Sequence, residues 1–157
     1  MKRFKAAGWV FLCALITLPV IGFVHELITF GYGWGFLTGE RDRYLLNGYL
    51  TIPSMIAFQL FGGVLDGIVL ALVTLVFYRT PLCHWMLGIG FVCLYGLGGN
   101  STATNYQIEF GATWRFPEAF MELMFHPVLT PALCLAGGGA FLWLTRRVWQ
   151  IDWRAKP

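Results

Sequence analysis

The sequence predicts an all-α membrane protein in which four transmembrane helices form one bundle. Of the 157 residues, 57% are hydrophobic and 12% are charged, whereas soluble domains carry about 25% charged residues. A helical span needs about 20 apolar residues, and polar segments divide this chain into four long apolar stretches. No linker or internal repeat interrupts it, so we expect residues 1–157 to form a single membrane domain.

The first span is predicted at residues 7–30. Three basic residues precede an uncharged run from Ala6 to Val24. A signal peptide has a similar charged start, but this run is long and no small-residue cleavage site follows it. We therefore expect an uncleaved helix that ends at the glycine-rich segment 31–35, because glycine stops helices well.

The second span is predicted at residues 53–78. Pro53 suits the first turn of a helix, and Thr51 or Ser54 can cap it. A charged segment, residues 40–43, precedes this helix and is expected to lie in water.

Small residues and one carboxylate share a face of the second span. Gly63 and Gly67 are four residues apart, a spacing that lets another helix approach closely. Asp66 follows Gly62 and Gly63 by four and three residues, so it lies on their side of the helix. We therefore expect Asp66 to face a neighbouring helix and to act in a proton relay or in helix pairing.

The third span is predicted at residues 82–98, with Thr80 as its cap and Pro81 in its first position. Polar residues follow from Gly98 to Phe116, and they predict a loop.

The fourth span is predicted at residues 118–144. Pro117 opens it, and Glu118 suits the positive first turn. The tail 145–157 mixes basic and tryptophan residues, so we expect it to lie at the membrane interface.

The basic residues predict the orientation. Short loops on the cytoplasmic side carry an excess of Lys and Arg. The four spans divide the 11 Lys and Arg residues into eight on one side and three on the other. The eight are Lys2, Arg3, Lys5, Arg79, Arg146, Arg147, Arg154 and Lys156, and the three are Arg41, Arg43 and Arg115. Both termini are therefore expected in the cytoplasm of a multi-pass inner (plasma) membrane protein.

The first and fourth spans carry ionisable residues at matching depth. By the helical rise of about 1.5 Å per residue, His25, Glu122 and His126 lie about 7, 6 and 12 Å below the outer surface. Glu122 and His126 are four residues apart, so one helix face should hold both. With His25 and Glu26 they are candidate ligands of zinc or copper. Polar pairing between helices is the equally weighted structural alternative.

Two prolines should expose backbone oxygens beside these residues. Pro127 lacks an N–H group and leaves the carbonyl of Leu123 without its helical donor, and Pro131 does the same for the carbonyl of Pro127. Broken helices of this kind coordinate ions in transporters.

These observations predict an accessory or assembly subunit of a larger membrane complex, carrying an outer-leaflet His/Glu cluster that binds a metal ion or relays protons. One alternative is a b-haem anchor subunit of a quinone-linked oxidoreductase, with His25 and His126 as axial ligands. A second is a small intramembrane lipid-processing enzyme, although the sequence assigns no catalytic residue. The expected partners are the lipid bilayer and other membrane subunits or further copies of the chain.

Two site classes gain no support from the sequence. The four cysteines, Cys13, Cys83, Cys93 and Cys134, form no ligand-spaced set, and we expect them to pack as small apolar residues. No run of basic and aromatic residues suggests nucleic-acid binding.

Overall fold

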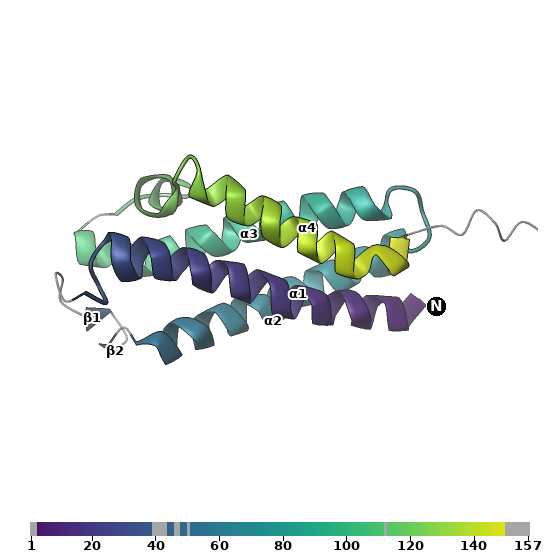
Figure 1. Cartoon of the computed structure of the whole chain (residues 1–157), viewed down its shortest axis with the longest axis horizontal. Coiled ribbons are helices and arrows are strands. Elements are labelled where there is room, and N and C mark those ends of the chain that lie inside the picture. Colours follow the sequence, from purple (N-terminus) through teal and green to yellow (C-terminus); the bar gives the residue numbers. More distant parts are fainter. Residues whose placement is uncertain (1–2, 39–43, 46–47, 50, 112, 150–157) are drawn as a thin grey trace, which may run out of the picture.

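Four long helices make up the computed structural model, which describes residues 3–38, 44–45, 48–49, 51–111 and 113–149 (Figure 1). The long helices are α1 (Arg3–Glu26), α2 (Ile52–Phe77), α3 (Cys83–Tyr106) and α4 (Leu129–Trp149). The short elements are the π-helices η1 (Leu27–Gly33) and η3 (Phe120–Met124), the 3-10 helix η2 (Gln107–Phe110), and the two-residue strands β1 (Tyr44–Leu45) and β2 (Gly48–Tyr49), which pair antiparallel. The all-α prediction is confirmed, whereas segment 40–43 and the tail beyond residue 149 lie outside the described residues.

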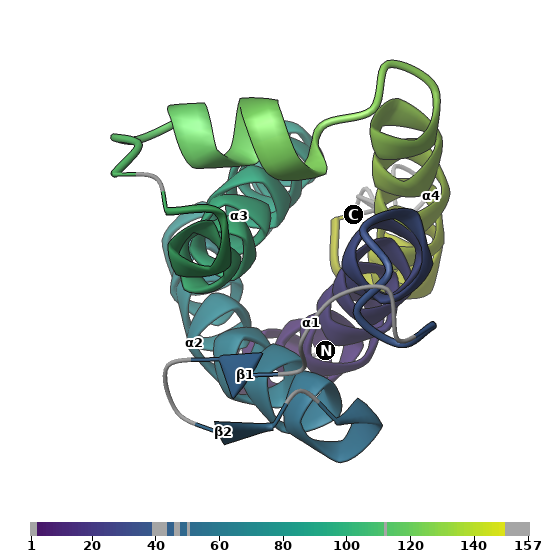
Figure 2. The same ribbon diagram turned by 90° about the vertical axis from the view of Figure 1, so that its left-hand side faces the viewer.

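The helices form a closed ring when the bundle is viewed along its length (Figure 2). α1 packs against α2 and α4, and α3 packs against the same two helices. The N-terminus, the α2–α3 turn and the end of α4 lie at one end of the bundle, which we call the basic end (Figure 1).

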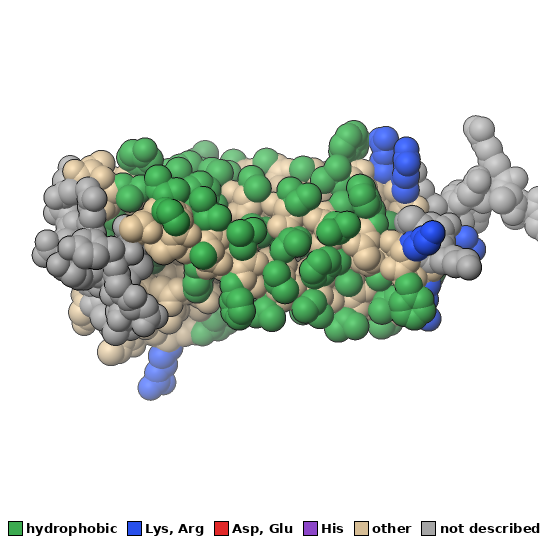
Figure 3. Space-filling model, turned by 90° about the horizontal axis from the view of Figure 1, so that it is seen from below, with side chains coloured by type: hydrophobic (Ala, Val, Ile, Leu, Met, Phe, Trp, Pro, Cys, Tyr) green, Lys and Arg blue, Asp and Glu red, His purple; other side chains and the backbone are tan. Residues whose placement is uncertain are grey.

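The outer surface is apolar along the bundle. The segments Arg3–Gly33 and Ile52–Phe77 are long and apolar enough to cross a membrane. Figure 3 shows hydrophobic side chains over the visible face, with most Lys and Arg side chains at the basic end. Soluble monomers rarely expose apolar patches of such extent.

The glycine pair of α2 brings α1 close. A Cβ atom on Gly63 would overlap the ring of Pro19, and one on Gly67 would lie 2.9 Å from the ring of Phe11. Both α1 residues therefore fill space that only glycine leaves open. The prediction that this pair permits close helix packing is confirmed.

The ends of α2 are partly as expected. Thr51 is the N-cap: its hydroxyl accepts from the Ser54 N–H at 3.2 Å, and the Ser54 hydroxyl accepts from the Thr51 N–H at 2.9 Å. The predicted Thr80 cap of α3 is wrong. The Thr80 hydroxyl instead donates to the Phe77 carbonyl at 2.7 Å and so satisfies the end of α2, while Arg79 adopts a φ of 62° at the turn.

The third helix is longer than predicted, because it continues to Tyr106 instead of ending at residue 98. Its polar residues bond to their own helix: the Thr102 hydroxyl donates to the Gly98 carbonyl at 3.0 Å and that of Thr104 to the Asn100 carbonyl at 2.8 Å. Helical geometry also buries Ala103 and Tyr106 against other helices. Tertiary packing therefore overrides the loop-like composition.

The predicted continuous fourth span, 118–144, is also wrong. The short helix η3 ends at Met124, Phe125 after it is extended with a ψ of 124°, and α4 begins at Leu129. Pro127 explains the break, since proline disfavours helical geometry in the residue before it and cannot donate a hydrogen bond. Pro131 falls in the first turn of α4, where proline is tolerated.

Two groups of buried side chains fill the bundle. The apolar core includes Ala6, Val10, Cys13, Ala14, Leu18, Ile21, Leu70, Cys83, Leu87, Phe91, Leu94, Tyr95, Phe141 and Val148. The aromatic core, toward the other end, includes Phe30, Phe36, Met55, Ala103, Tyr106, Ala119, Leu123 and Met124. The candidate site lies where these two cores meet.

Candidate functional site

His25 is fully buried in the last turn of α1 and makes hydrogen bonds through both ring nitrogens. Nε2 lies 3.0 Å from the Met124 carbonyl and 3.3 Å from the Thr130 hydroxyl. Nδ1 lies 2.8 Å from the Tyr95 hydroxyl. Because a carbonyl can only accept, Nε2 carries the hydrogen in this arrangement and Nδ1 accepts from Tyr95.

Glu26 is 3% exposed and engages both carboxyl oxygens. Gln59 Nε2 donates to Oε2 at 2.7 Å, and the Tyr106 hydroxyl donates to Oε1 at 2.9 Å. Gln59 Nε2 also donates to the Thr102 hydroxyl at 3.2 Å. The adjacent residues His25 and Glu26 therefore face different partners and connect α1 to the rest of the bundle.

We call this group of side chains the polar layer: His25, Glu26, Gln59, Tyr95, Thr102, Tyr106 and Thr130. Each of the four long helices contributes at least one member. Gly22 makes room for it, since a Cβ atom there would overlap the amide oxygen of Gln59. Buried polar groups of this kind are stable only when they are satisfied by hydrogen bonds.

Aromatic rings enclose the layer. The rings of Phe30 and Tyr106 stack at a centroid distance of 3.7 Å, and Phe36 contacts Tyr106 edge-on at 5.3 Å. Phe120 meets the His25 imidazole at 6.4 Å in a T-shaped arrangement. These apolar walls strengthen the enclosed hydrogen bonds, because they lower the local dielectric constant.

Glu122 and His126 do not share a helix face, so that prediction is wrong. Both side chains are exposed, and the chain breaks between them. His126 Nδ1 accepts from the N–H groups of Val128 and Leu129, each at 3.2 Å, while the His126 N–H donates to the Thr130 hydroxyl at 2.9 Å. His126 therefore caps the start of α4.

The break exposes backbone oxygens, as the prolines predict, and other helices use them. The Leu123 carbonyl accepts from the Trp34 indole N–H at 2.9 Å. The next carbonyl, of Met124, accepts from His25. The oxygens released near Pro127 are thus acceptors for side chains of the first helical segment.

The four predicted metal ligands separate into two pairs. His25 and Glu26 are buried in the polar layer, whereas Glu122 and His126 line a shallow surface groove beside η1. Within the described part of the chain, no three His, Cys, Asp or Glu side chains converge as metal ligands. The donor atoms of His25 and Glu26 are already engaged, so this arrangement favours neither a metal site nor axial haem ligation.

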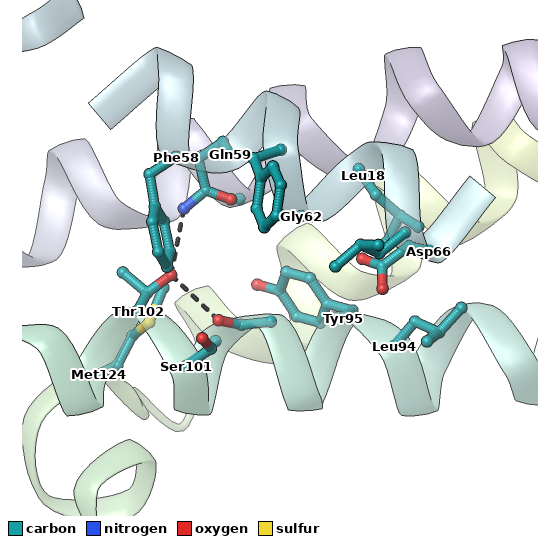
Figure 4. A pocket seen from close by; sticks show the side chains of 16 residues that line it. Leu18, Phe58, Gln59, Gly62, Asp66, Leu94, Tyr95, Ser101, Thr102 and Met124 are labelled. Atoms are coloured by element: carbon teal, nitrogen blue, oxygen red, sulfur yellow. Dashed lines mark hydrogen bonds between the residues drawn. The ribbon is translucent and has the colours of Figure 1, made fainter. Parts of the chain in front are cut away.

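Asp66 lies beside the polar layer in a cavity between α2 and α3 (Figure 4). The cavity has a volume of about 150 Å³. In Figure 4, Asp66 lies toward the end of the cavity away from Gln59 and Thr102, near Leu18 and Leu94. Among the described residues that line it, none is basic, so the lining offers the Asp66 carboxyl group no cationic partner.

Sequence reasoning missed most of the polar layer. Gln59 lies in an apolar helix seven residues before Asp66, and this spacing on one helix face could have identified it. Tyr95 and Tyr106 gave no such signal, because tyrosine is common at membrane interfaces. Tyr106 also lay in a segment predicted to be a loop.

Comparisons of the chain with protein-family models, curated proteins and solved structures give no match.

Proposed function

We propose that this chain is a multi-pass inner-membrane protein with four spans and cytoplasmic termini. Two features support the proposal. Large apolar side chains are exposed on all of the long helices, including Ile16 (61%), Leu72 (56%), Ile89 (56%) and Leu135 (76%). Most Lys and Arg side chains visible in Figure 3 lie at the basic end, as the positive-inside rule requires of a cytoplasmic face, and one lies toward the other end.

Reporter fusions at the C-terminus test this orientation. A green fluorescent protein fused after Pro157 should fluoresce, and an alkaline phosphatase at the same position should be inactive. The opposite pattern would place the C-terminus outside and contradict the proposed topology.

Within the membrane, we propose a structural role as an accessory or assembly subunit. The observation that carries this proposal is the closed state of the polar layer: His25 and Glu26 use all four of their polar side-chain atoms to hold other helices. Side chains committed in this way fix helix positions and leave no open ligand position.

The outer face of α4 supplies a surface for another helix. Ala132, Ala136 and Ala140 are exposed and recur every four residues, with Gly139 beside them. Small residues at this spacing let transmembrane helices approach closely. We therefore propose that α4 packs against a helix of another subunit.

Replacing Ala136 with Phe tests the assembly role. Native electrophoresis of gently solubilised membranes should show wild-type chain in a particle larger than the 17.7 kDa monomer. Ala136→Phe should release the monomer, because the ring prevents close approach. Leu72→Phe, on the exposed face of α2, is the matched control and should leave the particle intact. A monomeric wild-type protein would contradict the proposal.

Asp66 favours a second candidate function, proton handling. An ionisable group inside a membrane span usually marks a proton or ion pathway, and Asp66 lines a cavity without a basic neighbour. Proteoliposomes containing a pH-sensitive dye would test it. The wild type and the exposed-site control Glu118→Gln should dissipate a proton gradient, whereas Asp66→Asn should not. Equal rates of proton leakage for all three proteins would show that Asp66 does not conduct protons, and would leave helix pairing as its role.

The arrangement of side chains gives no support to haem ligation or lipid chemistry.

A further inference from the structure

We propose that a groove between α1 and α4 at the basic end binds the phosphate group of an anionic phospholipid. The groove has a volume of about 360 Å³, and its lining comprises Trp9, Trp143, Leu144, Arg146 and Arg147. This inference rests on the proposed membrane orientation but not on the assembly role.

A hydrogen bond between the two helices fixes the shape of the groove. The Trp9 indole N–H donates to the Leu144 carbonyl at 3.0 Å. This bond ties the first helix to the last and places one indole wall of the groove. Indole side chains favour the headgroup level of a bilayer, where an apolar body and a polar edge are both accommodated.

The second wall carries the charge. The Arg146 guanidinium lies over the Trp143 ring, 5.0 Å from its centroid, which is a cation–π geometry. Arg147 lines the same groove, and among the described residues of its lining there is no carboxylate. Each guanidinium can donate paired N–H bonds to a phosphate, which the ammonium group of a lysine cannot do in the same fixed geometry.

The surroundings favour a lipid over a soluble anion. Leu12 and Ile16 follow Trp9 by three and seven residues, so they continue its face along α1. Both are at least half exposed, at 50% and 61%. An acyl chain can therefore lie on this apolar strip while its phosphate occupies the groove. The proposed cytoplasmic leaflet also supplies anionic lipids at this depth.

Titration with defined lipids, read out by native mass spectrometry, tests the site. Delipidated protein in neutral detergent is mixed with phosphatidylglycerol or with phosphatidylcholine of the same acyl chains. We expect the wild type to bind one phosphatidylglycerol about tenfold more tightly than phosphatidylcholine, because each arginine near an anionic lipid surface strengthens binding several-fold. The double variant Arg146→Gln/Arg147→Gln should lose this preference.

Arg79→Gln is the matched control, because Arg79 lies at the same end, on the α2–α3 turn, but outside the groove. It should keep the preference. If Arg79→Gln lost the preference equally, the lipid would be attracted by the net charge of the whole end, and the proposed site would be wrong. Equal binding of both lipids by the wild type would do the same, and displacement of phosphatidylglycerol by millimolar inorganic phosphate would assign the groove to a soluble anion.

Two further readings separate the possible failures. Cys13 and Cys83 are buried, so their slow reaction with a thiol reagent should be unchanged in every variant that remains folded. Incorporation of the wild type into lipid nanodiscs reports on membrane insertion itself. A protein that inserts but shows no lipid preference contradicts this inference alone, whereas one that fails to insert contradicts the proposed function.

Discussion

The apolar core and the polar layer hold the same helices together by different means. Beside the apolar core, the buried hydroxyls of Thr17, Thr74 and Thr145 each donate to a carbonyl four residues earlier in their own helix. These bonds connect no helices. In the polar layer, by contrast, side chains of α1 bond to the other three long helices and to the break before α4.

In the proposed membrane setting, this difference follows from the solvent around the helices. Lipid tails are as apolar as leucine, so apolar contact by itself does little to favour one helix arrangement over another. Beside the apolar core, where α1 packs on α2, the arrangement depends on shape, because the ring of Pro19 fills the space that Gly63 leaves open. In the polar layer it depends on directional hydrogen bonds that a shifted helix could not make.

The largest effect should follow from Glu26→Ala. It removes the acceptor of the Tyr106 hydroxyl and one of the two acceptors of Gln59 Nε2. A buried polar group left unsatisfied costs about 1–3 kcal/mol, so we expect a loss of about 3 kcal/mol for the two contacts together. The free energy of unfolding, measured by titration with sodium dodecyl sulfate, should fall accordingly. Glu122→Ala, at an exposed carboxylate, is the control and should change it by less than about 0.5 kcal/mol. Equal effects would mean that the polar layer does not hold the bundle.

Two adjacent glycines of α2 test the role of shape where α1 packs on α2. Gly63→Ala should destabilise the protein by about 2 kcal/mol, because the new methyl group displaces Pro19. Gly62→Ala meets no atom within 4 Å and should stabilise the helix by up to about 1 kcal/mol. The same titration measures both. Effects of the same sign would contradict the close packing of α1 on α2.

The contact at the break should have a smaller effect. Trp34→Phe keeps an aromatic ring but removes the N–H that satisfies the Leu123 carbonyl, which should cost about 1 kcal/mol. Trp85→Phe, at a tryptophan that is 63% exposed, should be nearly neutral. Detergent unfolding monitored by circular dichroism compares the two. A neutral Trp34→Phe would show that water satisfies the oxygen equally well.

The smallest and most direct comparison uses two buried threonines. Thr102→Val removes an acceptor of Gln59, and bonds between membrane helices are worth about 0.6 kcal/mol on average. Thr17→Val removes only a bond within α1 and should change stability much less. Thermal unfolding, monitored by the reaction of Cys13 with a thiol reagent, would measure the difference in stability between the two variants. Equal losses would remove the proposed distinction between the two regions.

The helices themselves were largely predictable, because length and composition determine where apolar segments lie. The start of α2 was predicted because Thr51, Pro53 and Ser54 are local signals. The end of α3 was not, since its polar residues form a helix only when Ala103 and Tyr106 gain partners on other elements. Local composition cannot report such distant partners.

The site was predictable in part for the same reason. His25 and Glu26 stood out because ionisable residues are costly in an apolar segment. Their partners did not stand out. Whether Glu26 meets Glu122 or Gln59 depends on which helix faces touch, and the sequence does not specify this. The assumption of an unbroken helix through Pro127 then placed Glu122 and His126 on one face, and the break separates them.

The contacts of His25 also have a consequence for biosynthesis. Its partners Met124 and Thr130 follow it by 99 and 105 residues. At a synthesis rate of about 5–20 residues per second, the ribosome needs about 5–20 seconds to produce them. In the proposed membrane topology, Nε2 of the imidazole lacks both partners during that interval, although Gln59 reaches Glu26 after only 33 residues. The hydrocarbon layer penalises such an unsatisfied polar group. The nascent chain should therefore remain beside the insertion machinery until the last helix emerges, and a chain truncated before α4 should be recognised as incomplete and degraded.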